Sequence, residues 1–108
     1  MHDELPTFSY TLEPMPPSPV GRRWRWRLYR GERLLAAGWH YGERQALRAL
    51  RTATSRAAHE LAGLIALRPD RVTIDGRFFA GATVELTCGP LRCVLAPRPA
   101  EQAAEGAA

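Results

Sequence analysis

The segment from Arg22 to Arg30 alternates between large apolar and cationic residues, and this pattern constrains the fold more than any other feature of the sequence. On one side of an extended chain it places Trp24, Trp26 and Leu28. On the other side it places Arg23, Arg25, Arg27 and Tyr29. A period of two residues is typical of a β-strand with one buried and one solvated face. We therefore expect the indoles to face the core and the guanidinium groups to face water.

The next residues predict a hairpin. Gly31 and Glu32 form a two-residue turn, and glycine at the first central position favours type II′. The resulting register pairs Arg30 with Arg33, Leu28 with Leu35, Trp26 with Ala37 and Trp24 with Trp39. Most of the large apolar residues then share one face, so a slip of one residue would scatter them. The sequence thus predicts a hairpin with all three tryptophans on its core face.

Residues 43–67 change to a helical period. Spacings of three and four residues separate Leu47, Leu50, Thr54, Ala57, Leu61 and Leu64. A second stripe consists of Arg44, Arg48, Arg51, Ser55 and His59. Gly42 is the predicted N-cap and Pro69 the predicted stop, while Gly63 marks a close contact or an early end. The small residues Ala46, Ala49, Ala53 and Ala57 predict that the helix lies close against the tryptophans.

The remaining β patterns are short. Alternating or apolar runs occupy residues 7–13, 72–74, 78–79, 84–88 and 91–95. A proline-rich connector at residues 14–19 follows the first run, since proline fits neither a helix interior nor a central strand. Asp75–Gly76 is a type I′ hairpin signal, and Gly89–Pro90 turns the chain between the last two runs.

The order of these patterns predicts the α+β class. Strands and helix follow one another as β-β-β-α-β-β-β-β, which indicates two layers, with antiparallel β-hairpins packed on one long central helix. We expect an N-terminal strand and Pro-rich connector over residues 1–21, a single α+β domain over residues 22–97, and a disordered tail over residues 98–108. A chain of 108 residues has the usual length of one domain.

Charge is distributed unevenly along the chain. The formal net charge is +4, and all 15 basic residues are arginine. Residues 20–98 hold every arginine and six acidic residues, a balance of +9, whereas both ends are acidic. A basic body with acidic ends fits an anionic partner, or ends that fold back over the body.

The hairpin supplies the candidate face for an anionic partner. Its residues are Arg22, Arg23, Arg25, Arg27, Arg30 and Arg33, and its candidate extension on the helix is Arg44, Arg48 and Arg51. Such a row of arginines neutralises phosphates on nucleic acid or meets an acidic protein surface. The competing interpretation is an ordinary solvated sheet face in an arginine-biased composition.

The sequence carries no motif of a known catalytic site. We find no GxSxG, Walker, GxGxxG or HExxH pattern, and we predict no catalytic residue. Cys88 and Cys93 flank a tight turn, close enough to pair, and we expect reduced, semi-buried thiols with a disulfide as the alternative. The two cysteines and the scattered histidines do not make a zinc site, so no metal or cofactor is predicted.

These observations predict a small, soluble, non-enzymatic binding module. The first hypothesis is protein–protein interaction, as an accessory or regulatory subunit or a homo-oligomer, through a sheet edge or through the arginine face on an acidic surface. The alternative is a nucleic-acid-binding protein that uses the face with Arg23, Arg25 and Arg27. With no secretory signal pattern and no membrane-length apolar run, a cytoplasmic location is expected.

Overall fold

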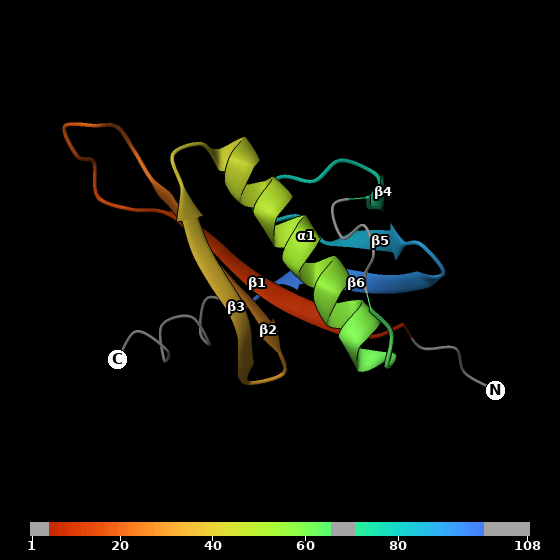
Figure 1. The fold of residues 1–108 in the computed structure, drawn as a ribbon. Helices are drawn as coiled ribbons and strands as arrows, with labels where there is room; N and C mark the ends of the chain where they lie inside the picture. Colours follow the sequence, from red (N-terminus) through yellow and green to blue (C-terminus); the bar gives the residue numbers. More distant parts are fainter. Residues whose placement is uncertain (1–4, 66–70, 99–108) are drawn as a thin grey trace.

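The computed structural model describes residues 5–65 and 71–98, which form one six-stranded sheet and one helix (Figure 1). In chain order the elements are β1 (Thr7–Pro14), β2 (Trp24–Arg30), β3 (Arg33–His40), α1 (Glu43–Leu61), β4 (Thr73–Asp75), β5 (Val84–Cys88) and β6 (Leu91–Pro97). The strands lie side by side in the order β3-β2-β1-β6-β5-β4. The predicted α+β class is confirmed.

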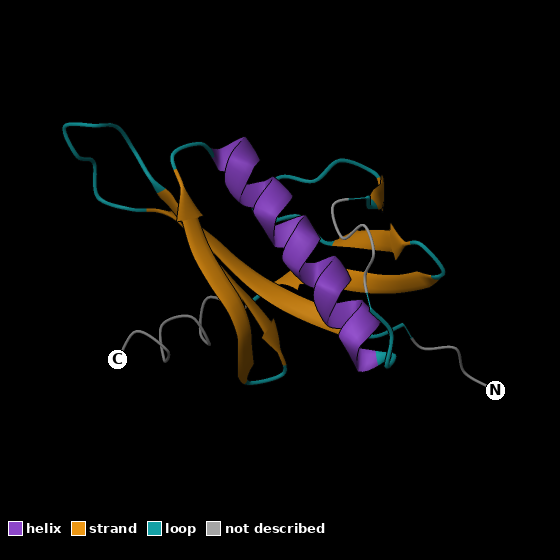
Figure 2. Cartoon of the chain, viewed as in Figure 1, coloured by secondary structure: helices purple, strands orange, loops and turns teal. Residues whose placement is uncertain are grey.

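Strand β1 lies in the middle of the sheet and joins its two halves. It pairs antiparallel with β2 and parallel with β6, where Phe8 is opposite Leu95. The expectation of a purely antiparallel sheet is therefore wrong at this one pair. The helix crosses the face of the sheet on which Phe8, Leu28 and Leu95 point inward (Figure 2).

The Trp-rich hairpin forms where predicted, but its register contains a bulge. Arg30 pairs with Arg33 as expected, whereas Leu28 pairs with Ala36, Trp26 with Gly38 and Trp24 with His40. Leu35 is the extra residue, and the three predicted pairs beyond it are wrong by one position. Because a bulge reverses the sidedness of all later residues on its strand, Trp39 lies beside Arg25 on the face away from the helix.

The helix ends at Leu61, two residues before Gly63, and is therefore shorter than the predicted span of residues 43–67. Gly63 has a φ of +75°, its N–H donates to Glu60 O, and the N–H of Leu64 donates to His59 O. These two bonds form a Schellman motif, which satisfies the last carbonyl groups of a helix. The glycine therefore marks the early end that the sequence analysis named as one of its two alternatives.

The buried face of α1 is also rotated relative to the predicted stripe. Its buried residues are Ala46, Leu47, Leu50, Thr54, Ser55 and Ala58. Leu61, expected in the core, is exposed. Ser55 belongs to the core instead of the solvated stripe, and Arg51 is half-buried and donates to Val72 O at 2.9 Å.

The chain after the helix forms three strands where four were predicted. Residues 78–79 make no strand, and the Asp75–Gly76 hairpin is wrong, because β4 pairs with β5 instead. Phe78 packs its ring edge-on against Tyr10, with 5.6 Å between ring centroids. Residues 76–83 thus run as a connection that closes over the core.

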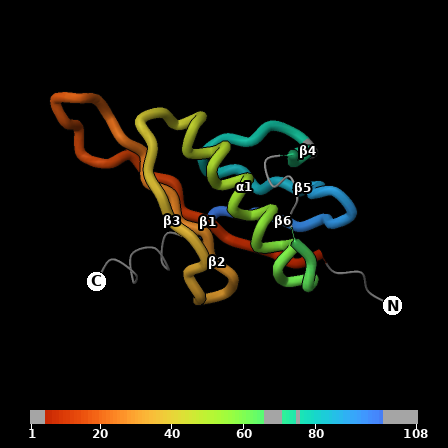
Figure 3. Tube along the Cα trace, in the orientation of Figure 1, coloured from red at the N-terminus to blue at the C-terminus, as the bar shows by residue number. Residues whose placement is uncertain are grey.

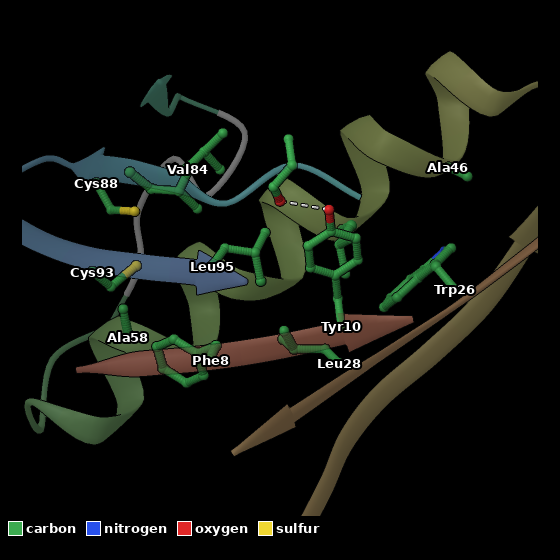
Figure 4. Close-up of a cluster of buried hydrophobic side chains, with 13 residues drawn as sticks. Phe8, Tyr10, Trp26, Leu28, Ala46, Ala58, Val84, Cys88, Cys93 and Leu95 are labelled. Carbon is green, nitrogen blue, oxygen red and sulfur yellow. Dashed lines mark hydrogen bonds between the residues drawn. The ribbon is translucent and has the colours of Figure 1, made fainter. Parts of the chain in front are cut away.

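The core gathers side chains from β1, β2, β5, β6 and α1 (Figure 4). Its largest fully buried members are Tyr10, Phe8, Leu28, Leu50, Leu86 and Leu95. The hydroxyl of Tyr10 donates to Ala82 O at 2.7 Å and accepts from the N–H of Gly81 at 3.1 Å. These bonds fix the 76–83 connection to the central strand, since a buried hydroxyl needs partners.

The structure describes parts of the two segments, residues 1–21 and 98–108, that were predicted to flank the α+β domain. The connector between β1 and β2 projects beyond the sheet (Figure 3). Arg98, assigned to the tail, has a nearly buried side chain that stacks 4.0 Å from the Tyr29 ring centroid and donates to Gly31 O. The rest of the predicted tail, residues 99–108, lies outside the described residues.

Replacing Gly38 by alanine should destabilise the hairpin. A Cβ atom there would lie 2.9 Å from Cζ2 and Nε1 of Trp26, whose indole crosses the glycine. Overpacking of this kind costs about 1–3 kcal/mol of unfolding free energy, measurable by urea denaturation.

A Trp26→Phe background provides the control for this substitution. The smaller ring makes room for the methyl group, so Gly38→Ala should cost less there than in the natural chain. An equal cost in both backgrounds would show that the contact with Trp26 is not the cause.

Candidate functional site

A groove of about 1220 Å³ separates α1 from β3. The buried side chains of Phe8, Trp26 and Leu28 lie beneath it. Its accessible apolar floor is formed by the half-buried Leu35 and Ala36, and the helix contributes Ala49, Ala53 and Ala57 as one wall. The volume exceeds the range of roughly 300–1,000 Å³ usual for small-ligand pockets. The groove is therefore larger than most small-ligand pockets and has room for a short extended segment of chain.

Small residues create this groove. The alanines at positions 49, 53 and 57 pack against the core that contains Trp26, and α1 contacts both β2 and β3, but these small side chains stay half-buried and leave space beside them. On the opposite side Gly38 has no side chain and leaves its space to the indole of Trp26. That indole is 6% exposed, and its Nε1 has no hydrogen-bond partner within the described chain.

Four arginines line the groove. Arg30 and Arg33 come from the hairpin end and Arg48 and Arg56 from α1, against the single carboxylate of Glu60. Arg33, Arg48 and Arg56 are exposed, as is Arg30, whose guanidinium lies 5.5 Å from the ring centroid of Phe8. The rim is thus strongly cationic around an apolar floor.

Arg30, Arg33 and Arg48 were among the predicted site residues, whereas Arg56 was missed. The signal was available, since residues eight apart lie on the same face of an α-helix and Arg56 follows Arg48 by eight. The sequence does not show that this face of the helix lies opposite β3, the edge strand of the hairpin.

Strand β3 forms one edge of the sheet. It pairs with β2 on one side, and the sheet order places no strand of the described chain on the other. Residues 36–40 run in unbroken register with β2 after the bulge at Leu35. The opposite edge, β4, has only three residues. An edge strand presents N–H and C=O groups ready to pair with another extended chain.

The face of the sheet away from α1 carries the predicted arginine row. The pairing of β1, β2 and β3 places Arg25 beside Glu13 on one strand and Trp39 on the other. Arg25 donates to Glu13 Oε1 at 2.6 Å, and the guanidinium of Arg23 lies 5.5 Å from the Trp39 ring centroid. Trp39 is 48% exposed, so the row includes an aromatic side chain that the sequence analysis assigned to the core.

The nine predicted arginines do not form one surface. Arg23, Arg25 and Arg27 occupy the face away from α1, whereas Arg30, Arg33 and Arg48 line the groove. Arg22 and Arg44 are exposed outside the groove. Arg51 is held by the carbonyl of Val72 and does not extend a basic surface.

Within residues 5–65 and 71–98 no three His, Cys, Asp or Glu side chains come together as a set that could hold a metal ion. Over the same residues, no helix has the length and apolar character needed to cross a membrane. Comparison with known proteins gives no matching family model, no matching curated protein and no matching solved structure.

The corrected register predicts unequal roles for two tryptophans. Trp26→Ala should cost about 3–5 kcal/mol of unfolding free energy, because it removes a buried indole from the core. Trp39→Ala should cost about 1 kcal/mol or less, since it removes a half-exposed ring that contacts Arg23. Urea denaturation measures both, and equal losses would contradict the bulge at Leu35.

Proposed function

We propose that this chain is a small binding module that receives an extended, acidic polypeptide segment along β3. The segment adds a strand to the sheet edge and lays alternate side chains into the groove between β3 and α1. The observation that carries the proposal is the placement of a four-arginine rim and an apolar floor beside the longer unpaired edge of the sheet.

Backbone geometry supports an extended partner. The added strand would pair with residues 36–40, where β3 is regular. Strand addition draws its affinity from main-chain hydrogen bonds, and its specificity comes from pockets for alternate side chains. The side chains that point toward α1 would meet Leu35 and Ala36 of β3 and the half-buried alanines of α1, which give the groove its accessible apolar lining.

Charge supports an acidic partner over a second copy of this chain. The groove brings Arg30, Arg33, Arg48 and Arg56 together with a single acid. A second copy docked there would bring the same arginines to the same rim, and like charges in an interface cost free energy. Carboxylates at the ends of a bound strand would instead pair with guanidinium groups.

An alternating peptide of valine and glutamate, eight residues long and fluorescently labelled, tests this proposal. Binding to the full chain should raise its anisotropy and weaken as salt is added. The double substitution Arg48→Glu, Arg56→Glu should weaken binding by about tenfold or more, because it reverses charge at one wall of the groove.

Arg71→Glu with Arg77→Glu is the matched control. Both residues are exposed and lie outside the groove, so the same change in net charge should leave peptide binding nearly unchanged. Equal weakening by both double variants would mean that total charge and not the groove binds the peptide. If light scattering gives the mass of a dimer and the peptide does not bind, the edge at β3 is the contact between two copies of this chain.

A second function, binding of single-stranded nucleic acid, is favoured by one observation. The face away from α1 combines Arg23, Arg25 and Arg27 with the half-exposed ring of Trp39. Basic side chains that follow a phosphate backbone, with aromatic rings on which bases stack, are typical of such binders.

Salt dependence tests the nucleic-acid function with a labelled thymidine oligonucleotide. The logarithm of the binding constant should fall with the logarithm of salt by about 0.7 per phosphate contacted. Changing Arg23, Arg25 and Arg27 to glutamate should abolish binding, and Trp39→Leu should weaken binding of single strands more than of duplex. If the oligonucleotide still binds after the triple substitution, this face is not the nucleic-acid-binding site.

A further inference from the structure

Cys88 and Cys93 lie together in the core, at the turn end of the β5–β6 hairpin. The ladder pairs Cys88 with Leu91 and Cys93 with Leu86, so both thiols point to the same side, toward α1. Both side chains are buried, and neither is part of a disulfide. Figure 4 shows their sulfur atoms directed toward each other from β5 and β6.

His59 of α1 stands beside this pair in a defined orientation. Its Nδ1 lies 2.8 Å from the carbonyl oxygen of Ser55. A carbonyl only accepts hydrogen bonds, so Nδ1 carries the proton in the neutral ring and Nε2 is left as an acceptor. Nε2 faces the backbone of Gly89, 3.9 Å from the place of a Cβ atom there, directly after Cys88.

These neighbours distinguish the two thiols. The neighbouring Cys93 thiol lowers the pKa of Cys88 to about 7, burial opposes this effect, and the charge of His59 adds to it. The neighbouring Cys88 sulfur, together with burial, raises the pKa of Cys93. The order of the two pKa values makes Cys88 the thiol that ionises first, the division between an attacking and a resolving cysteine. Because both thiols are buried, peroxide reaches Cys88 only when the hairpin opens at its exposed Gly89–Pro90 turn.

We infer that Cys88 and Cys93 form a redox-active dithiol that hydrogen peroxide converts into an intramolecular disulfide. The Cys88 thiolate attacks one peroxide oxygen, the O–O bond breaks, and a sulfenic acid and hydroxide result. The sulfur of Cys93 then attacks that of Cys88, the S–O bond breaks, and the second oxygen leaves as water. In total two thiols and one peroxide give one disulfide and two waters.

The hairpin geometry makes this disulfide reversible. Diagonal positions of an antiparallel pair have Cα atoms about 7–8 Å apart, slightly beyond the usual span of a disulfide. Closure therefore draws the two strands together near the exposed Gly89–Pro90 turn, where Gly89 has a φ of +65°. A disulfide formed under such tension is more easily reduced than a relaxed one.

The direct test is oxidation of the full chain followed by peptide mapping. Reduced protein is treated with hydrogen peroxide at neutral pH, alkylated under denaturing conditions and digested with trypsin. Trypsin cuts after Arg92, between the two cysteines, so a disulfide joins two peptides that separate on reduction. The expected result is loss of both free thiols, appearance of the joined pair, and recovery of both thiols with dithiothreitol.

Single variants assign the roles. Cys93→Ser should stop at a sulfenic acid on Cys88 that dimedone traps, whereas Cys88→Ser should leave Cys93 unoxidised. His59→Gln should move the midpoint of the pH–rate profile upward from about 7, because His59 and Cys93 are the titratable neighbours that act on Cys88. His40→Gln, a histidine on β3, is the matched control and should leave the midpoint unchanged.

Three results would overturn the inference. Both thiols could remain titratable after peroxide treatment of the folded chain. The joined peptides could arise only in cross-linked dimers, as shown by a non-reducing gel. Oxidation could proceed at the same rate in Cys88→Ser as in the natural chain. Because the mapping needs no substitution, a variant that fails to fold does not decide the outcome.

Discussion

The parallel pairing of β1 with β6 is the contact on which the rest of the structure depends. Without it the chain would consist of a Trp-rich hairpin and a Cys-containing hairpin, each too small to bury a helix. Pairing Phe8 with Leu95 places the two hairpins in one sheet, and that sheet gives α1 a continuous apolar surface. Tyr10, on the same strand, then fixes the connection before β5 through its hydroxyl.

This pairing also explains what the sequence could and could not predict. Strand positions followed from alternation, and the helix start followed from Gly42, because these signals are local. The contact between β1 and β6 joins residues more than eighty positions apart, and no local pattern marks it. The bulge at Leu35 was hidden because Leu34 and Leu35 are both apolar, so inserting one residue leaves the composition of each face plausible.

The candidate sites were predictable in their residue types more than in their grouping. The predicted single basic face is divided by the sheet into a groove rim and an opposite row, and Arg51 is half-buried instead of extending it. Arg56 was not predicted, although its spacing from Arg48 puts the two on one helix face, and only the packing of α1 shows that this face looks toward β3. For Cys88 and Cys93 the turn indicated proximity, while the role of His59 depends on the helix lying across that turn.

The bulge at Leu35 has a consequence for how copies of this chain meet one another in concentrated solution. A long regular edge would let copies stack strand upon strand without limit, which is the first step toward insoluble fibres. A bulge interrupts the ladder at the beginning of β3 and increases the local twist of a strand, and Arg33 adds charge at that end. Residues 36–40, which stay in regular register, are enough to pair with one short extended segment and too few to support a continuous stack of copies.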